Sequence, residues 1–231
     1  MRKLSSVSFF CPAYYDEKNI PLVVKDADKF LRKTAKKYEI IVINDGSPDK
    51  TGEIADKLAK KYKNMKVIHH KENKGYGGAL KTGFMNAKYD YVMYTDGDNQ
   101  YDVFEFNNLI PLLKNSDIVA GYVSKKAISK RRKLQSEIYN TLIFLLFGVY
   151  FKDINCSMKI FKRKVLENIE IKSKSAFIDA EMIIKAKRKG FKIMRKEVTH
   201  KPRIHGIAGG SKLSVILPTI KEMMKLRLRI L

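Results

Sequence analysis

Two carboxylates lie one residue apart at the end of an apolar run, in the stretch 94–100 (YTDGDNQ). The run 89–95 predicts a buried strand, and Gly97 permits a turn directly after it. Because side chains at i and i+2 share a direction in extended chain, Asp96 and Asp98 are able to face one cation. Oxygen ligands favour Mg²⁺ or Mn²⁺, which keep open positions for phosphate oxygens. The pair therefore predicts a metal site that clamps a diphosphate, although the same residues also suit an ordinary surface turn.

The elements that would position this pair alternate along the first half of the chain. Apolar segments predict strands at residues 6–11, 39–44, 65–69, 89–95 and 117–121, and helices are expected at 17–38, 48–62, 76–87 and 103–113. Apolar strands without alternation, linked by helices, predict an α/β protein with a mostly parallel sheet covered on both faces. Ligands of such sheets bind outside the carboxyl ends of the strands.

Polar or glycine-rich loops follow four of the predicted strands. These loops are residues 12–17, 44–49 and 73–78, together with the turn that holds the carboxylate pair. Asp16 and Asp45 are suited to accept hydrogen bonds from a nucleobase or ribose, and Tyr14 is suited to stack on a base. The glycines of the segment 75–78 let backbone approach a ligand at the positive end of a helix. Each loop alone resembles an ordinary turn, but together they predict a nucleotide site at one sheet edge.

Composition constrains the partners. The 231 residues, 45% hydrophobic, are enough for one domain with a real core, and 47 Lys+Arg against 24 Asp+Glu give a net charge of +23. Such a charge favours a polyanionic partner, which is nucleic acid, an anionic membrane surface or a phosphorylated substrate. Basic residues concentrate at 125–133, before the uncharged block 141–151. This order is typical of a helix in a membrane interface, too short to span the bilayer, although a helix that fills the core is the alternative.

Two further features concern the compartment. Cys11 and Cys156 are too few for a disulfide framework and are interpreted as packing residues. The amino-terminal apolar stretch is interrupted by Ser8 and ended by Pro12, unlike a secretory signal. We therefore expect a cytoplasmic protein.

A series of motifs runs in order through nearly the whole chain. They are PAYYDEKNI, VINDGSPDKT, NKGYGGAL, TDGDNQ, DINCSMKIFKRKVL, FIDAEMIIKAKRKGFKIMRKEVTHKPR and GGSKL. Together they resemble the family 2 glycosyltransferases of the GT-A fold, and most closely the polyprenyl-phosphate glycosyltransferases of the dolichol-phosphate mannose synthase type. Two positions depart from the family pattern. Asn44 replaces the first Asp of the usual pair, which leaves the choice between uridine and guanosine open, and Ser157-Met158 replaces Gly-Phe on the acceptor side.

The resemblance implies one GT-A (Rossmann-like) domain over residues 1–231. Within it, residues 1–121 would form the nucleotide-sugar half and 122–212 the acceptor half, and 213–231 would be a basic, amphipathic helical segment broken by Pro218. The implied activity is inverting, metal-dependent transfer from a UDP- or GDP-sugar to a polyprenyl phosphate, by an enzyme peripheral on the cytoplasmic face of an anionic membrane. One alternative is a soluble family 2 transferase that uses a saccharide hydroxyl. A nucleic-acid-binding protein is a remote one, since it leaves the carboxylate pair unexplained.

The resemblance also assigns roles to residues. The nucleotide-sugar site would comprise Pro12, Ala13, Tyr14, Asp16, Asn44, Asp45, Gly75, Asp96, Asp98, Arg203, Ser211 and Lys212, and the Mn²⁺ or Mg²⁺ ligands would be Asp96, Asp98 and Gln100. A lipid phosphate is already ionised, so Arg131 and Arg203 would matter more than a base. A saccharide hydroxyl must lose its proton, and Asp153 or Asp179 would then be the base. Each of these residues also has a purely structural interpretation. Asp153 would be a turn residue, Asp179 a charge at the start of a helix and Arg203 a solvated side chain.

Overall fold

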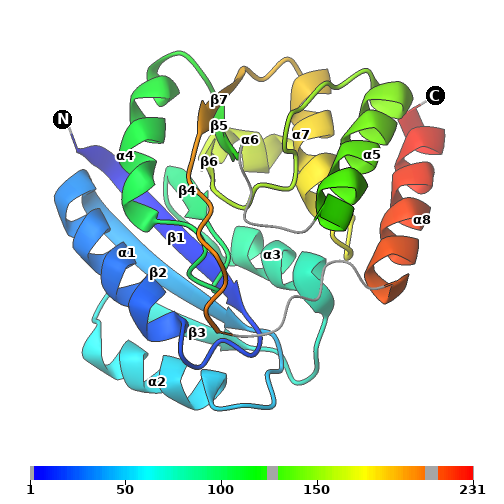
Figure 1. Cartoon of the computed structure of the whole chain (residues 1–231). Coiled ribbons are helices and arrows are strands. Elements are labelled where there is room, and N and C mark those ends of the chain that lie inside the picture. Colours follow the sequence, from blue (N-terminus) through cyan, green and yellow to red (C-terminus); the bar gives the residue numbers. More distant parts are fainter. Residues whose placement is uncertain (1–2, 124–129, 206–212, 231) are drawn as a thin grey trace.

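The computed structural model describes residues 3–123, 130–205 and 213–230, with the side chains of 130–132, 213 and 214 left out. The described residues form a seven-stranded sheet in the order β3-β2-β1-β4-β6-β5-β7 (Figure 1). The strands are β1 (Leu4–Ala13), β2 (Ala35–Asn44), β3 (Met65–His69), β4 (Tyr91–Tyr94), β5 (Ile118–Tyr122), β6 (Lys159–Lys162) and β7 (Ile193–Glu197). Only β6 runs antiparallel to its neighbours in this sheet, so the predicted mostly parallel α/β fold is confirmed.

Helices cover both faces of the sheet (Figure 1). They are α1 (Ile20–Thr34), α2 (Thr51–Lys61), α3 (Gly75–Asn86), α4 (Phe106–Leu109), α5 (Lys130–Phe147), α6 (Arg163–Asn168), α7 (Ile178–Arg188) and α8 (Leu213–Ile230). One core cluster packs α1, α2 and α4 on one face, and a second packs α3, α5, α6, α7 and α8 on the other. Among the described residues, no helix combines the length and the apolar character needed to cross a bilayer.

Alternating side chains of each central strand enter opposite cores. In β1, Phe9 belongs to the first cluster and Phe10 to the second, and in β2 Val42 and Ile43 divide in the same way. Because both faces are covered here, the central stretches 9–11 of β1 and 40–43 of β2 are apolar on both sides and show no polar alternation. Cys11 and Cys156 are free and fully buried, and burial raises the pKa of both thiols, in agreement with packing roles.

Three elements differ clearly from expectation. The helix expected over 17–38 ends at Thr34, because residues from Ala35 onward pair with β1 in parallel, beginning with Leu4 opposite Ala35. The helix expected over 103–113 divides into a 3₁₀ turn (Val103–Glu105), α4 and a second 3₁₀ turn (Ile110–Lys114), where Pro111 supplies no N–H for an α-helical bond. Finally, α8 runs through Pro218 without a break.

The chain from the predicted acceptor half enters the sheet at β6. This strand lies between β4 and β5, which both come from the first 122 residues, and its partners in β4 are Tyr91–Tyr94. The two predicted halves therefore share one sheet, and both contribute to each of its two core clusters.

Candidate active site

The acidic turn sits directly against the end of β1. The Gly97 N–H donates to the Pro12 carbonyl over 3.1 Å, and a Cβ at residue 97 would lie 2.4 Å from that same oxygen. Only glycine permits this approach, because a real Cβ contact is never so short. The turn that carries Asp96 and Asp98 is therefore held at the sheet edge where β1 and β4 both end.

The two carboxylates have different surroundings. Burial and the neighbouring Asp98 charge raise the pKa of Asp96 to about 7, while hydrogen bonds with Ser157 and Tyr76 oppose that rise. The buried Oδ1 of Asp96 has no hydrogen-bond partner among the residues that the structure describes. Asp98 accepts the Gln100 N–H over 3.0 Å at Oδ1, and its Oδ2 forms an ion pair with Arg203. The turn thus holds concentrated negative charge that a cation would relieve.

This donor set fits a hard divalent ion. Within the ranges that the structure describes, no three His, Cys, Asp or Glu side chains gather into a metal cage. Mg²⁺ and Mn²⁺ do not require one, since they are commonly held by one or two carboxylates with water and phosphate oxygens completing the shell. Asp96, with its unpartnered oxygen, and Asp98 supply that pair. The side-chain amide of Gln100 instead donates to the Lys201 carbonyl over 2.9 Å, and its role as a ligand stays a prediction.

A segment distant in sequence reaches the acidic turn. After β7 the chain crosses the sheet edge (orange in Figure 1), where Tyr101 and His200 form an antiparallel bridge and Lys201 N–H donates to the Gln100 carbonyl over 2.8 Å. This path brings Arg203 onto Asp98, 105 positions away. Arg203, which is predicted to bind phosphate, therefore lies at the predicted metal turn, and its guanidinium is paired with a carboxylate rather than only solvated. Ser211 and Lys212 lie outside the described residues, as does the side chain of Arg131.

The loop after β1 is organised by its own hydrogen bonds. Asp16 accepts the Tyr14 N–H over 3.0 Å at one oxygen and the Asn19 amide over 2.9 Å at the other, while its own N–H donates to Thr51. Burial raises the pKa of Asp16, although these hydrogen bonds oppose the rise. Asp16 consequently shapes the loop, and its contact with a base or ribose stays a prediction.

Tyr15 is a residue that the sequence analysis did not single out. Its φ is +59°, a region costly for a bulky side chain, and its N–H donates to Ser47 over 2.8 Å. Its ring meets that of Tyr14 edge to face at 4.7 Å, and both rings are about two-fifths exposed, at 40% and 43%. The two rings together offer an exposed aromatic surface beside the acidic turn.

The loop after β2 joins its neighbours on both sides. The Asp45 N–H donates to the Ala13 carbonyl over 3.0 Å. Asn44, which replaces the expected Asp, accepts the Ser47 N–H over 3.2 Å and bonds the His69 ring over 3.0 Å. Asp45 is held at Oδ1 by His70, over 2.6 Å, and by the Lys74 N–H, over 2.9 Å. The sequence analysis did not single out His70 and so missed this contact.

Two glycines of the segment 75–78 have different surroundings. Gly75 has a φ of +76° and open space where a Cβ would stand, which is compatible with a ligand nearby. At Gly77, in contrast, a Cβ would lie 2.1 Å from the Ser175 carbonyl. The missing side chain of Gly77 therefore lets α3 pack against the loop before α7, and an approach of its backbone to a ligand stays a prediction.

Behind the acidic turn lies a buried ion pair. Lys159 on β6 is fully buried and donates to Asp179 Oδ1 over 2.6 Å and to the Tyr94 hydroxyl over 3.0 Å, as well as to the Cys156 carbonyl. The Tyr94 hydroxyl also donates to Asp179, whose buried Oδ2 has no hydrogen-bond partner within the described part of the chain. Sequence reasoning missed Lys159, because a lysine in a strand is ordinarily expected at the surface.

The remaining acidic candidates also have structural contacts. Asp153 is 2% exposed and accepts the Val123 N–H over 3.2 Å. Asp179 and Glu181 both lie in the first turn of α7, where carboxylates are favoured by the helix dipole. Whether Asp153 or Asp179 acts as a base stays a prediction.

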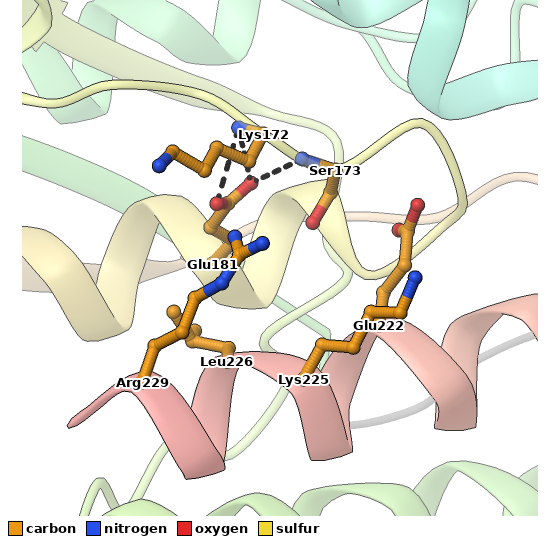
Figure 2. Close-up of a pocket in the computed structure, with 7 residues that line it drawn as sticks. All are labelled: Lys172, Ser173, Glu181, Glu222, Lys225, Leu226 and Arg229. Carbon is orange, nitrogen blue, oxygen red and sulfur yellow. Dashed lines mark hydrogen bonds between the residues drawn. The ribbon is translucent and has the colours of Figure 1, made fainter. Parts of the chain in front are cut away.

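A pocket away from the acidic turn anchors α8 (Figure 2). Glu181 accepts the backbone N–H groups of Lys172 and Ser173, with Lys225, Leu226 and Arg229 of α8 along the opposite wall. Glu222 of α8 accepts the N–H groups of residues 174 and 175 in the same loop. Both carboxylates thus accept hydrogen bonds from backbone N–H groups. Through Glu222, α8 is fixed to the loop of residues 174 and 175, against which Gly77 also packs.

Comparison with known families decides what this arrangement belongs to. Residues 8–170 match the model of the glycosyl transferase family 2 domain. The chain is a family 2 glycosyltransferase. This family 2 enzyme is 30% identical over 209 residues to the glycosyltransferase AglD of Haloferax volcanii, covering 85% of this chain and 33% of that protein. It is 30% identical over 204 residues to a dolichyl-phosphate β-glucosyltransferase of Trichomonas vaginalis, covering 81% of this chain and 63% of the relative. It thus spans about a third of the first relative and under two thirds of the second.

A solved structure confirms the GT-A fold of this glycosyltransferase. The glucosyl-3-phosphoglycerate synthase of Mycobacterium tuberculosis, crystallised with Mn²⁺, UDP and glucosyl-3-phosphoglycerate, superposes with a TM-score of 0.73 at 18% identity. The match covers 96% of this chain and 80% of that one. At this identity the likeness concerns the fold alone.

Proposed function

We propose that this glycosyltransferase moves a sugar from a UDP- or GDP-sugar to a polyprenyl phosphate, with inversion at the anomeric carbon. The observation that carries the proposal is the ion pair between Arg203 and Asp98 of the acidic turn. This pair lies at the end of the sheet where β1, β2 and β3 lead into the proposed nucleotide loops. Similarity to dolichyl-phosphate β-glucosyltransferases supports the lipid phosphate acceptor. Anionic substrates and lipids account for the net charge of +23 without a nucleic acid.

The residues of the acidic turn would hold Mn²⁺ or Mg²⁺ at Asp96 and Asp98, with Gln100 as a third predicted ligand. When bound, the ion supplies Lewis-acid stabilisation of the departing diphosphate. The guanidinium of Arg203, already paired with Asp98, is placed to neutralise phosphate oxygens at the same point. A lipid phosphate is ionised at neutral pH, so its attack requires cations that offset the repulsion between two anions and needs no strong base.

The alternative acceptor, a saccharide hydroxyl, would need a base. Asp179 is committed to Lys159 and Tyr94, and Asp153 to the Val123 N–H, and both carboxylates are 2% exposed. Neither is open to an incoming hydroxyl in this conformation. This favours the phosphate acceptor over the soluble family 2 alternative.

The proposed location is peripheral, on the cytoplasmic face of an anionic membrane. Exposed apolar residues recur at helical spacing on α5 (Leu134, Ile138, Leu142 and Leu145) and on α8 (Leu217, Ile220, Met224 and Leu228). Ile143 of α5 and Met223 of α8 are buried in the same core cluster, so each helix uses one side for packing and leaves another apolar. We name these exposed residues the apolar stripes. Stripes flanked by Lys and Arg are typical of helices that lie in a lipid interface.

A donor and acceptor screen tests the proposal. Purified chain is incubated with Mn²⁺, dolichyl or undecaprenyl phosphate, and each of a panel of UDP- and GDP-sugars. We expect one nucleotide class to yield a lipid-linked sugar of inverted anomeric configuration, and EDTA to abolish it. Transfer to a saccharide with no lipid-linked product would contradict the acceptor assignment, and product that resists EDTA would contradict the metal.

A further inference from the structure

We propose that His70 is a positioning residue for the nucleotide donor, which it serves by fixing the carboxylate of Asp45. This inference rests on the proposed function, because Asp45 belongs to a nucleotide pocket only if the donor is a nucleotide sugar. The ring of His70 bonds to Asp45 and Thr82, and it is assigned no role in holding the metal or the diphosphate. Its predicted effect is confined to the nucleobase end of the donor.

His70 bridges two elements that border the pocket. It directly follows β3, and its Nδ1 lies 2.6 Å from Asp45 Oδ1, while its Nε2 lies 2.9 Å from the Thr82 hydroxyl of α3. The side chains of His70 and Asp45 are only 3% and 4% exposed. A hydrogen bond at this burial has little competition from water, so it holds the carboxylate in one orientation.

The direction of each hydrogen bond follows from the chemistry of the partners. A carboxylate only accepts, so Nδ1 of His70 must carry the proton that it donates to Asp45. The Thr82 hydroxyl also lies 3.0 Å from the Gly78 carbonyl. If Thr82 donates to that carbonyl, it accepts from a protonated Nε2, and otherwise it donates to Nε2 of the neutral ring. In both states the bond to Asp45 is kept.

The same carboxylate oxygen receives a second donor. The Lys74 N–H reaches Asp45 Oδ1 over 2.9 Å, and the Asn73 amide donates to the Asp45 carbonyl over 3.1 Å. Among the described residues, both hydrogen bonds to the Asp45 side chain end on Oδ1, so Oδ2 keeps its acceptor capacity for a ligand. Uracil and guanine each present a ring N–H that a carboxylate oxygen can accept. His70 therefore sets the direction in which Asp45 offers this oxygen.

The experiment compares two probes on the same variants. Calorimetric titration of the full chain with UDP or GDP in Mn²⁺ measures nucleotide binding, and titration with inorganic pyrophosphate in Mn²⁺ measures the diphosphate contact alone. His70→Leu should weaken nucleotide binding by about tenfold, the worth of one hydrogen bond to a charged group, and leave pyrophosphate binding unchanged. With sugar donor, the KM should rise while kcat changes less than twofold.

Conservative variants separate positioning from folding. His70→Asn keeps an N–H donor at the place of Nδ1, so it should recover most of the nucleotide affinity. Thr82→Val removes the outer bond to His70 and the hydroxyl contact with the Gly78 carbonyl but keeps the bond between His70 and Asp45, so it should lose less nucleotide affinity than His70→Leu. Tyr38→Phe is the structural control: it deletes a 2.7 Å hydrogen bond to Asp28 between α1 and β2, and should leave nucleotide binding unchanged.

The outcomes are distinguishable. If wild type binds nucleotide and His70→Leu and His70→Asn bind it equally well, the inference is overturned while the proposed function stands. Equal losses of nucleotide and pyrophosphate binding would also overturn it. If wild type binds neither UDP nor GDP, the proposed function itself fails, and the role of His70 fails with it.

Discussion

The loops of the proposed donor side and the strand and helices of the proposed acceptor side use charged residues in opposite ways. On the proposed donor side, the Asp45 carboxylate bonds to His70 of the neighbouring loop and the Asp16 carboxylate bonds to Tyr14 and Asn19 of its own loop, so both are oriented at the end of the sheet. On the acceptor side, Lys159 and Asp179 are paired inside the core, and the charge facing the edge arrives through Arg203. The difference indicates that the carboxylates of the proposed donor side are oriented in loops at the end of the sheet, whereas those of the proposed acceptor side stabilise the core behind it.

The largest expected effect comes from the point where the two sides meet. Asp98→Ala removes a predicted metal ligand and the partner of Arg203, so turnover should fall by about a thousandfold. The measurement is lipid-linked product per unit time, with circular dichroism to check the fold. Asp26→Ala, on α1 outside the site, should keep wild-type turnover. Wild-type activity in Asp98→Ala would refute the metal assignment.

The acceptor-side ion pair should matter for stability. Lys159→Met leaves Asp179 buried without its cation and should lower the free energy of unfolding by about 3–5 kcal/mol. Chemical denaturation provides the measurement. The control on the same strand is Lys162→Met, whose partner Asp117 is 3.6 Å away at the surface and which should cost less than about 1 kcal/mol. If both variants lowered the free energy of unfolding by the same amount, the buried pair would contribute no more to stability than the pair of Lys162 and Asp117.

The pH dependence of metal binding sharpens the electrostatic contrast. With the pKa of Asp96 raised to about 7, the folded metal-free protein binds more protons than the unfolded chain between about pH 4 and about pH 7. Its stability should therefore fall as pH rises through that window. A divalent ion needs the ionised carboxylate, so Mn²⁺ affinity should rise by about tenfold per pH unit up to about pH 7 and then level off.

Titration calorimetry across this range measures the metal affinity, and thermal unfolding without metal measures the stability. Asp96→Asn should flatten the stability slope, since the amide does not titrate. A Mn²⁺ affinity that does not change with pH would contradict the shifted carboxylate.

The smallest expected effect concerns the apolar stripes. Leu142→Glu or Leu145→Glu places a charge where lipid is proposed to lie, and each should lower binding to anionic vesicles by about tenfold or less. Vesicle flotation is the measurement. Leu22→Glu is the control, since it makes the same substitution at an exposed leucine away from the stripes. Leu22 is 45% exposed and lies on α1, which covers the other face of the sheet. If all three variants bind vesicles alike, the stripes are not the lipid contact.

Much of the donor side was accessible from sequence because its signals are local. The bounds of β3, Met65–His69, agree with the apolar run that predicted them, and each predicted loop does follow a strand. The acidic turn was found because two carboxylates and a glycine lie within three residues. Boundaries were less accurate where charged residues suit either state, as at Ala35–Tyr38, where pairing with β1 overrides the helical pattern.

The sequence by itself determined the α/β class, the order of the loops at the sheet edge and the pair of carboxylates. Tertiary structure alone decided that β6 enters between β4 and β5, that Lys159 is buried against Asp179, that His70 holds Asp45 and that Arg203 reaches Asp98. The physical reason is range. Strand and turn preferences depend on neighbours within a few residues, whereas an ion pair between residues 105 positions apart depends on the whole path of the chain between them.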